Sequence, residues 1–464
     1  MSAAGWPLLG DGDLQAPLAW RAGRAISRAQ FLRQAQALSS LLPDRGPLLA
    51  LTNDRYRFAL SLAAALWRGQ PSLLPPNHTP DLMARLAARF EGLHALVDEL
   101  PAGTAAPTGL SMRPWPVEVE RIGLDEAAAA VEPPWLPADQ VCAQVLTSGS
   151  TGEPVPHDKA WGALVVNIRA EARRVAEHLG RADLQGVTLV GTVPAQHMYG
   201  FESTVLLALL GGAAFAAQRP FFPADVVQVL ESVPRPRVLV TTPFHLRTLV
   251  ASGLVLPPVD LIISATAPLS PQLAQRAELA LAGPLMEIYG CTEAGQVATR
   301  RCTAGPDWRT FDGLSLQGDG AEAIVSGGHV PAPVMLADVL EVLAPDRFRL
   351  LGRSNDLINV AGKRSSLSHL NFHLNSIDGV VDGVFHLPPA DGAEDMVRLV
   401  AVVVAPSLTR EALLAALRQR VDPVFLPRRI HFVDTLPRDP TGKLPAGRLA
   451  DWVVQLAASA SRGG

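Results

Sequence analysis

Leu-Thr-Ser-Gly-Ser-Thr-Gly-Glu-Pro occupies residues 146–154 and follows directly on an apolar stretch, residues 141–146. Glycine permits the backbone bends by which successive N–H groups converge on an anion, and hydroxyl side chains add further donors. The stretch therefore predicts a strand that ends in a phosphate-binding loop. This loop is not a Walker A motif, because no Gly-Lys-Ser/Thr follows. An ordinary turn after a strand is the alternative. The candidate phosphate-binding residues are Thr147, Ser148, Gly149, Ser150, Thr151 and Gly152.

The chain on both sides of this loop alternates between short apolar stretches and helix-like stretches. Strands are expected at residues 47–52, 71–74, 93–97, 187–193, 237–241, 259–264 and 285–288. Helices are expected at residues 55–67, 81–90, 224–232 and 271–281. Apolar strands separated by helices are typical of an α/β fold with mostly parallel, buried sheets.

The C-terminal part has a different pattern. Residues 314–351 combine short strands with Gly, Pro and Asp turns, which predicts a small β unit within the large N-terminal domain. A charged turn at 353–356 follows, and then a small α+β domain with a strand at 398–404 and a helix at 410–420. The expected division is a core domain over residues 1–352, a connection at 353–356 and a C-terminal domain over 357–464.

Composition limits the classes of protein to consider. Of the 464 residues 48% are hydrophobic and 18% charged, as in globular proteins, and a net charge of −4 argues against nucleic acid as the partner. Three cysteines without metal-site spacing fit a reducing compartment. The N-terminus lacks a signal-peptide pattern, and the longest apolar run, residues 205–217, is too short to span a bilayer. We therefore expect a cytoplasmic protein without an integral membrane segment.

Four further polar clusters follow the loop along the chain. The first is Pro-Ala-Gln-His-Met-Tyr-Gly at 194–200, and the second combines Ser-Ala-Thr-Ala-Pro-Leu at 264–269 with Tyr-Gly-Cys-Thr-Glu at 289–293. The third combines Asp338 with residues 352–356 and with Gly-Lys-Arg at 362–364, and the last is Leu-Pro-Arg-Asp-Pro-Thr-Gly-Lys at 436–443.

Each of these clusters also has a purely structural interpretation. A histidine beside apolar residues, such as His197, is more often structural than functional. Glu293 could cap a helix that begins at Ala294. The charged residues around Arg353 could form a solvated surface turn, and an exposed lysine after a glycine turn is common.

With the five clusters in this order, the chain resembles the adenylate-forming superfamily, which unites acyl-CoA synthetases, peptide-synthetase adenylation domains and firefly luciferase. The resemblance covers about residues 46–450 and is stronger after residue 140. The compact form with Thr-Ser-Gly-Ser-Thr-Gly-x-Pro-x-Pro-His-x-Lys-x-Trp at 147–161 looks most like the small AMP-ligases of bacterial aryl-polyene pigment pathways.

The resemblance implies an ATP site built from the first three clusters. The loop at 147–152 would hold the β- and γ-phosphates, and His197 would border the acyl pocket. The Tyr289 ring would stack on adenine, Thr292 would approach the α-phosphate, and Glu293 would bind Mg²⁺, which prefers hard oxygen ligands. The other residues expected at the nucleotide are Ala265, Thr266, Ala267 and Gly290.

The last two clusters would complete the site. The resemblance implies that Asp338 and Arg353 bind the ribose, that Arg364 contacts phosphate, and that Asn355 is the hinge of a mobile C-terminal lid. Lys443 would bridge the substrate carboxylate and the α-phosphate.

Three departures from the family pattern bear on this picture. Val155 stands where the loop lysine is normally found, and Lys159 or His157 could reach back to replace it. Asn355 removes a charge that the hinge commonly carries. The glutamate that often follows the 362–364 cluster is absent, which puts the CoA-facing surface in doubt.

The resemblance implies a ligase that activates an aryl or medium-chain carboxylic acid with ATP. Acyl-AMP would form with release of pyrophosphate, and the acyl group would pass to a thiol, either of CoA or of a phosphopantetheinyl acyl carrier protein. One alternative is a degenerate adenylate-fold protein that binds nucleotide or acyl-AMP as a sensor or scaffold. Another is an oxidase of luciferase type, although no residue here specifies an oxygen-dependent step.

Overall fold

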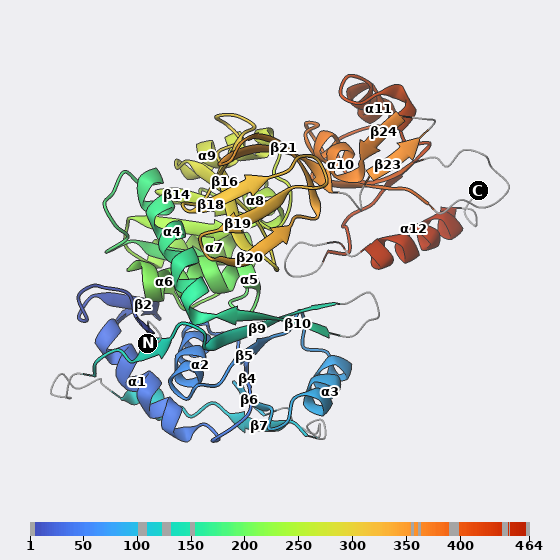
Figure 1. The fold of residues 1–464 in the computed structure, drawn as a ribbon. Coiled ribbons are helices and arrows are strands. Elements are labelled where there is room, and N and C mark those ends of the chain that lie inside the picture. Colours follow the sequence, from blue (N-terminus) through green and yellow to red (C-terminus); the bar gives the residue numbers. More distant parts are fainter. Residues whose placement is uncertain are drawn as a thin grey trace.

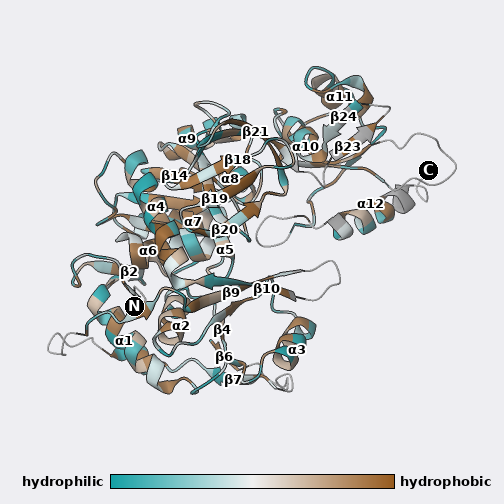
Figure 2. Cartoon of the chain, viewed as in Figure 1, coloured by the Kyte–Doolittle hydropathy of each residue, from teal (hydrophilic) through white to brown (hydrophobic). Residues whose placement is uncertain are grey.

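The described part of residues 5–353 contains two large β-sheets with helices around them (Figure 1). The computed structural model describes residues 5–100, 109–122, 131–148, 154–353, 357–360, 363–388, 399–438, 444 and 446–460. Within them the order of elements matches the expected α/β alternation, and hydrophobic residues concentrate on the central strands and on the helix faces that cover them (Figure 2).

The smaller sheet has six strands in the order β10-β9-β5-β4-β6-β7. Its neighbouring strands are parallel except for the hairpin of β9 and β10. The strands are β4 (Leu48–Leu51), β5 (Ser72–Leu74), β6 (His94–Val97), β7 (Ser111–Pro114), β9 (Val141–Ser148) and β10 (Pro154–Ala160). The hairpin places the candidate phosphate-binding loop at one edge of this sheet.

The larger sheet has eleven strands in the order β21-β22-β17-β16-β15-β14-β13-β11-β12-β2-β3. It is parallel from β15 to β2 and antiparallel beyond. Its parallel strands are β2 (Pro17–Arg21), β11 (Thr188–Gly191), β12 (Ala214–Ala216), β13 (Arg237–Thr241), β14 (Leu261–Ser264) and β15 (Leu285–Cys291). The remaining strands are β3 (Arg24–Ser27), β16 (Gly295–Arg300), β17 (Trp308–Thr310), β21 (Asp338–Ala344) and β22 (Arg347–Arg353).

Helices fill the space between the two sheets and cover their outer faces. The helices between them share one continuous core with both sheets, and are α1 (Arg28–Leu41), α2 (Arg55–Trp67), α4 (Trp161–His178), the π-helix η2 (Phe201–Leu206) and α6 (Leu207–Gly211). Helix α3 (Pro80–Arg89) covers the outer face of the smaller sheet. The outer face of the larger sheet is covered by α7 (Pro223–Ser232), α8 (Pro243–Val250) and α9 (Pro271–Leu281).

Local sequence explains where several helices begin. Asp54 precedes α2, and its carboxylate accepts hydrogen bonds from the N–H groups of Tyr56 at 2.8 Å and Arg57 at 3.2 Å. Ser270 caps α9 in the same way through the N–H of Leu273. A proline stands in the first turn of α3, α7, α8 and α9, where its missing N–H leaves no bond unmade.

A buried arginine joins the central helix layer to the larger sheet. The guanidinium of Arg55, at the start of α2, donates to the carbonyl oxygens of Gly191 and Val193, each at 2.9 Å. It also donates to the carbonyls of Ala216 at 2.8 Å and Gln218 at 3.1 Å. A Cβ atom at residue 191 would lie 2.7 Å from this guanidinium, so the close approach requires glycine there.

Residues 357–460 form smaller elements with cores of their own. A hairpin of β23 (Leu357–Val360) and β24 (Lys363–Ser366) precedes a three-stranded sheet in the order β25-β26-β27. Its strands are β25 (Asp382–His386), β26 (Val400–Val404) and β27 (Arg429–Phe432), and its helices are α10 (Leu367–Asn375), α11 (Arg410–Arg418) and α12 (Ala446–Ala460). Two hydrophobic clusters confined to these elements make this part an α+β body, as expected.

The structure corrects one expectation and adds strands and helices that the sequence did not predict. The stretch 314–351 is divided: β18 (Leu314–Gln317), β19 (Ile324–Gly327) and β20 (Val330–Met335) form a separate sheet, whereas β21 and β22 join the larger sheet. Pairing of Trp308 with Phe348 is the non-local contact responsible. The described parts of residues 101–138, where the sequence predicted no strand or helix, contain β7 and β8 (Trp135–Pro137). Sequence reasoning missed α1 and α4.

One result bears on the membrane. Among the helices of the described residues, none combines the length and the hydropathy needed to cross a bilayer. The apolar run at 205–217 instead turns from η2 and α6 into strand β12.

Arg55→Met tests whether the buried guanidinium holds the helix layer to the larger sheet. Four carbonyl oxygens would lose a donor, and leaving buried groups unsatisfied should cost at least about 3 kcal/mol. We expect the first thermal transition to fall by about 4 °C or more, because the unfolding entropy of a body of this size is large. Differential scanning calorimetry measures this, with the exposed Arg24→Met as the control. An unchanged transition in Arg55→Met would contradict the role.

Candidate active site

The Tyr-Gly-Cys-Thr-Glu motif lies where β15 turns back into β16. Cys291 pairs with Gly295, so Thr292 and Glu293 occupy the tip of a tight hairpin. Gly295 has φ of +75°, a conformation that suits glycine, and strand rather than helix continues from it. The interpretation of Glu293 as a helix cap is therefore wrong. Its carboxylate lies exposed at the tip, and Thr292 is half-buried.

A hydrogen bond joins this motif to the expected ribose residue. The Tyr289 hydroxyl donates to the Asp338 carboxylate at 2.7 Å across 49 residues of sequence. Asp338 in turn pairs directly with Arg353 in the register of β21 and β22. The Tyr289 ring packs against Phe348 and Trp308, with centroids at 5.5 and 5.8 Å. The structure thus brings three of the predicted nucleotide residues together.

The turn after β14 lies beside them. Strand β14 runs parallel to β15, and Ser264 pairs with Glu287, so the turn of Ala265, Thr266 and Ala267 emerges at the same edge of the sheet as Tyr289. Thr266 has φ of +80°, which a β-branched residue rarely adopts. Such strain clusters at ligand sites, and the carboxyl ends of parallel strands are where α/β sheets bind ligands.

Lys159 is directed toward the hairpin tip. Its ammonium donates to the carbonyl oxygen of Thr292, and the carboxylates of Glu202 and Glu293 also act on it. Burial lowers the pKa of Lys159 despite these neighbours. Among the described residues the partner of Lys159 is Thr292. That Lys159 also replaces the loop lysine stays a prediction, because residues 149–153 lie outside the described residues.

The hairpin of β9 and β10 accounts for the other residues near the loop. Thr147 Oγ1 lies 3.0 Å from His157 Nε2, so the histidine already has a partner on the neighbouring strand. Val155, in the position of the usual loop lysine, pairs with Thr147 and is 43% exposed. Residues 149–153, and with them Gly149, Ser150, Thr151 and Gly152, lie outside the described residues, as does the side chain of Ser148.

His197 occupies the start of a short helix between the two sheets. It stands at the N-cap of α5 (Met198–Gly200) and is half-buried. A Cβ atom at residue 200 would lie 2.0 Å from the carbonyl oxygen of Pro194, so the Pro-x-x-His-x-x-Gly spacing closes a turn that only glycine permits. The neighbouring Gln196 amide donates to Thr52 O at 2.6 Å, which anchors this turn to the smaller sheet.

Two buried glutamates lie behind the hairpin tip, and sequence reasoning missed both. Glu202, in η2, accepts a hydrogen bond from Asn167 Nδ2 at 2.8 Å. Neither carboxylate oxygen of Glu171 has a hydrogen-bond partner within normal geometry, although Ser203 and Gln296 lie close enough to act on it. Burial raises the pKa of Glu171 to about 7 and that of Glu202 to about 8. For Glu202 the available signal was its position two residues after the Pro-x-x-His-x-x-Gly turn.

The chain contains few lysines, and one of them lies at the candidate site. Lys159, Lys363 and Lys443 are the three lysines of the chain, and all other permanent cations are arginines. Lys159 stands at the hairpin tip, and Lys443 is the expected catalytic residue. An ammonium group is a compact point charge that can move between phosphate oxygens, whereas guanidinium favours fixed, planar contacts.

Several predicted residues lie where the structure gives no account of their side chains. Asn355 and Lys443 are outside the described residues, and the side chains of Arg353 and Arg364 are not described. Among the described residues, no group of three or more His, Cys, Asp or Glu side chains could by itself hold a metal ion. The exposed carboxylate of Glu293 nevertheless suits Mg²⁺, which usually takes one or two protein carboxylates beside waters and substrate phosphates.

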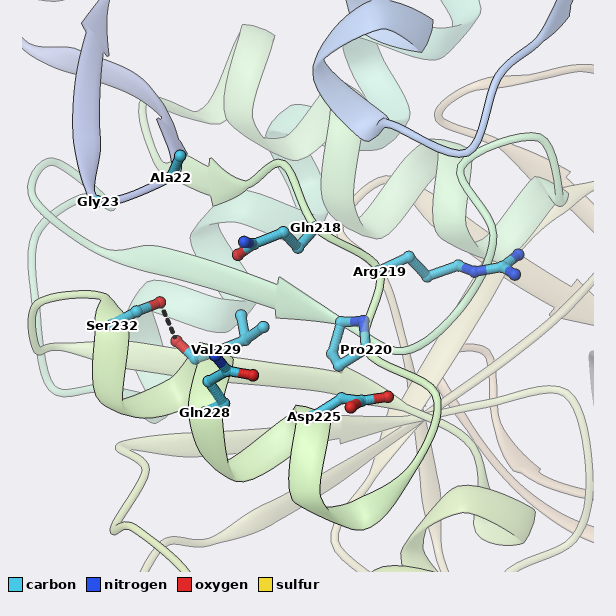
Figure 3. Close-up of a pocket in the computed structure, with 9 residues that line it drawn as sticks. All are labelled: Ala22, Gly23, Gln218, Arg219, Pro220, Asp225, Gln228, Val229 and Ser232. Carbon is cyan, nitrogen blue, oxygen red and sulfur yellow. Dashed lines mark hydrogen bonds between the residues drawn. The ribbon is translucent and has the colours of Figure 1, made fainter. Parts of the chain in front are cut away.

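A surface pocket of the larger sheet lies away from these residues. It has a volume of about 400 Å³ and is lined by Ala22, Gly23, Gln218, Arg219, Pro220, Asp225, Gln228, Val229 and Ser232 (Figure 3). In Figure 3 the Arg219 side chain extends away from the other lining residues. Arg219 also borders a small hollow beside Ala195 and Gln196, next to His197. Of these two hollows, the second borders the candidate site.

Comparison with known proteins places most of the chain in one family. The family model described as "AMP-binding enzyme" matches residues 19–327, and the model of the "AMP-binding enzyme C-terminal domain" matches residues 391–443. A 4-coumarate–CoA ligase of Rhodobacter capsulatus is 31% identical over 301 residues, which cover 64% of this chain and 73% of the relative. A 4-chlorobenzoate–CoA ligase of an Arthrobacter species is 24% identical over 94% of this chain and 92% of its own length.

Solved structures share the fold over nearly the whole chain. ATP-bound MatB of Rhodopseudomonas palustris superposes with a TM-score of 0.76 at 18% identity and covers 95% of this chain and 96% of its own. The anthranilate CoA ligase AuaEII in complex with anthranoyl-AMP gives 0.76 at 17% identity, with coverage of 96% and 95%.

Glu171→Gln tests the buried carboxyl through the pH dependence of stability. The pKa of Glu171 is raised from 4.5 to about 7 by burial, so the folded protein binds the proton more tightly than the unfolded chain. The stabilisation from this tighter proton binding is fully present below pH 4.5 and is lost as the pH rises through 7. The free energy of unfolding falls over this range by roughly 2–4 kcal/mol. The variant should therefore gain thermal stability over the natural protein between pH 5 and pH 8, as measured by Tm. Exposed Glu231→Gln is the control, and a pH-independent difference for Glu171→Gln would contradict the assignment.

Proposed function

This chain belongs to the family of AMP-binding enzymes, and we propose on that premise that it is an AMP-forming acid–thiol ligase. It activates a carboxylic acid with ATP to acyl-AMP and pyrophosphate. It then transfers the acyl group to a thiol and releases AMP.

One observation carries the nucleotide site. The hydrogen bond from Tyr289 to Asp338 joins two motifs far apart in sequence, and Arg353 stands opposite Asp338 on the neighbouring strand. An aromatic ring bonded to a carboxylate, with an arginine at the opposing strand position, suits an adenine ring and a ribose diol. The strained turn at Thr266 lies at the same sheet edge and supports this assignment.

The first half-reaction sets the electrostatic demand. An oxygen of the substrate carboxylate attacks the α-phosphorus of ATP, and the bond from that phosphorus to the bridging oxygen of pyrophosphate breaks. Two anions must approach each other, so the site must supply positive charge where negative charge accumulates. Lys159 at the Thr292 carbonyl is one such cation, and Lys443 is the other that we assign to this step.

We assign Glu293 as the protein ligand of Mg²⁺. The ion supplies positive charge at the phosphates when bound. The position of Glu293 at the exposed hairpin tip leaves its carboxylate accessible for this role, and Thr292 beside it is placed to contact the α-phosphate.

In the second half-reaction a thiolate sulfur attacks the acyl carbon, and the carbon–oxygen bond to AMP breaks. We propose that residues 357–464 form the lid that turns about Asn355 to admit this thiol. The cores of the C-terminal elements, separate from those of residues 5–353, support a rigid-body turn.

The proposed substrate is an aryl acid. The curated relatives are named for 4-coumarate and 4-chlorobenzoate, and the solved AuaEII complex holds anthranoyl-AMP. The acceptor is CoA or a phosphopantetheinyl carrier protein. We place the enzyme in the cytoplasm, where ATP and reduced thiols are available and where three unpaired cysteines stay reduced.

Val155 supports one competing function. A cradle without its usual lysine could bind nucleotide or acyl-AMP without turnover, as a sensor or scaffold. Lys159 at the hairpin tip argues against this alternative, because it keeps a cation beside the reacting groups.

ATP–pyrophosphate exchange over benzoic, cinnamic and straight-chain acids tests the proposal. We expect exchange with at least one aryl acid, followed by AMP release when CoA or carrier protein is added. Lys443→Ala should lower the rate of acyl-AMP formation about 100-fold or more. Tight ATP binding without exchange for any acid would favour the sensor function. Acyl-AMP formation at the unchanged rate would remove Lys443 from the mechanism.

Lys159→Ala separates the contribution of this cation from that of the loop. Loss of positive charge at Thr292 should reduce kcat/KM for ATP about tenfold or more, and Lys159→Arg should restore part of it. Steady-state kinetics measure both, with exposed Arg24→Ala as the control. If KM and kcat for ATP both stay unchanged, the loop holds phosphate through its hydroxyls and backbone alone.

A further inference from the structure

One carboxylate, that of Asp382, binds arginines from two distant parts of the chain. Arg247 Nη1 lies 2.5 Å from Asp382 Oδ1. Arg438 donates to the same carboxylate twice, from Nε to Oδ2 at 2.6 Å and from Nη2 to Oδ1 at 2.8 Å. Asp382 begins strand β25 and is buried, so the three charges meet largely out of contact with water.

Arg247 brings the N-terminal body into this cluster. It lies on α8, which packs on the larger sheet through Leu246 and Leu249. Besides Asp382, its guanidinium donates to the carbonyl oxygen of Val381 at 3.4 Å. Burial lowers the pKa of Arg247, which the neighbouring Asp382 opposes. Without the Asp382 carboxylate, the desolvation cost of burying this guanidinium would not be compensated.

Arg438 brings in the segment that leads to the catalytic lysine. It stands five residues before Lys443. Leu436, two residues earlier, is buried in the C-terminal core with Val402 and Leu449, so the segment enters from a fixed position. The bidentate pair with Asp382 then orients the chain at residue 438, because a planar guanidinium and a carboxylate with two bonds allow little rotation.

We propose that Asp382 is a positioning residue for adenylation: it docks the segment before Lys443 onto Arg247 of the N-terminal body. This inference rests on the proposed function insofar as Lys443 acts in acyl-AMP formation. The carboxylate bridges one arginine from each side, so the start of the Lys443 loop and the N-terminal body are held in one arrangement. Turning of the lid for thiol transfer breaks the Arg247 contact and leaves the Arg438 pair intact.

The three residues differ in what their removal would disturb. Replacing Asp382 leaves two arginines facing each other, which combines loss of docking with like-charge repulsion. Replacing Arg247 leaves the Asp382–Arg438 pair whole and removes only the link across the two bodies. Arg247→Ala is therefore the sharper variant, and Arg247→Lys keeps a cation at the same place.

Separate measurement of the two half-reactions tests the proposal. For Arg247→Ala we expect single-turnover formation of acyl-AMP to fall about tenfold, while thiol transfer from supplied acyl-AMP changes less than about twofold. Arg247→Lys should recover part of the first rate. Arg301→Ala is the matched control, because it breaks a bidentate arginine–glutamate pair, Arg301–Glu278, that lies wholly within the N-terminal body.

Equal losses in both half-reactions, or no change in either, would overturn the proposal, since a general loss of stability affects both steps. Small-angle scattering of the same proteins gives an answer that does not depend on turnover. The radius of gyration should rise in Arg247→Ala and stay unchanged in Arg301→Ala. If the natural protein forms no acyl-AMP from any acid, the proposed function fails, and an identical radius in Arg247→Ala would then separately overturn the docking role.

Discussion

The guanidinium of Arg55 is the contact on which the arrangement of the N-terminal body depends. It lies between the sheets and donates to four carbonyl oxygens at or just after the ends of strands β11 and β12. An ionised group is expensive to bury, so this position is stable only while all four acceptors are present. The result fixes the turn that carries His197, because that turn begins where β11 ends.

The candidate site follows from this sheet geometry. Parallel strands β14 and β15 end at one edge, and the antiparallel strands beyond them return Asp338 and Arg353 to the same edge. A nucleotide bound there, as we propose, would meet the Thr266 turn, the Tyr289 ring and the hairpin tip from neighbouring strands. The proposed reaction between two anions at this edge also requires positive charge. Lys159, on strand β10 of the smaller sheet, supplies a cation at Thr292. The site is therefore built across both sheets.

Sequence patterns predicted many elements closely where the determinants are local. Helices α2 and α9 and strand β13 begin and end at the expected residues, because a cap or a proline starts each helix and apolar runs mark the strand. The placement of β21 and β22 in the larger sheet was not predictable, since it depends on pairing with β17, distant in sequence. Helix α4 was not predicted. The burial of Glu171, which it carries, was not predictable either, because no local pattern indicates it.

The residues alone predicted the α/β class and the order of the motifs, because apolar periodicity and turn chemistry depend on local sequence. Tyr289, Thr292, Glu293 and Asp338 were predicted as candidate residues from the family resemblance of these motifs. Which of these groups meet follows from the packing of the chain alone. This packing directed Lys159 to Thr292, brought Tyr289 to Asp338, and set Asp382 between Arg247 and Arg438. The physical reason is that electrostatic and hydrogen-bond partners are chosen by distance in space, and burial, which makes those partners matter, is a property of the packed chain.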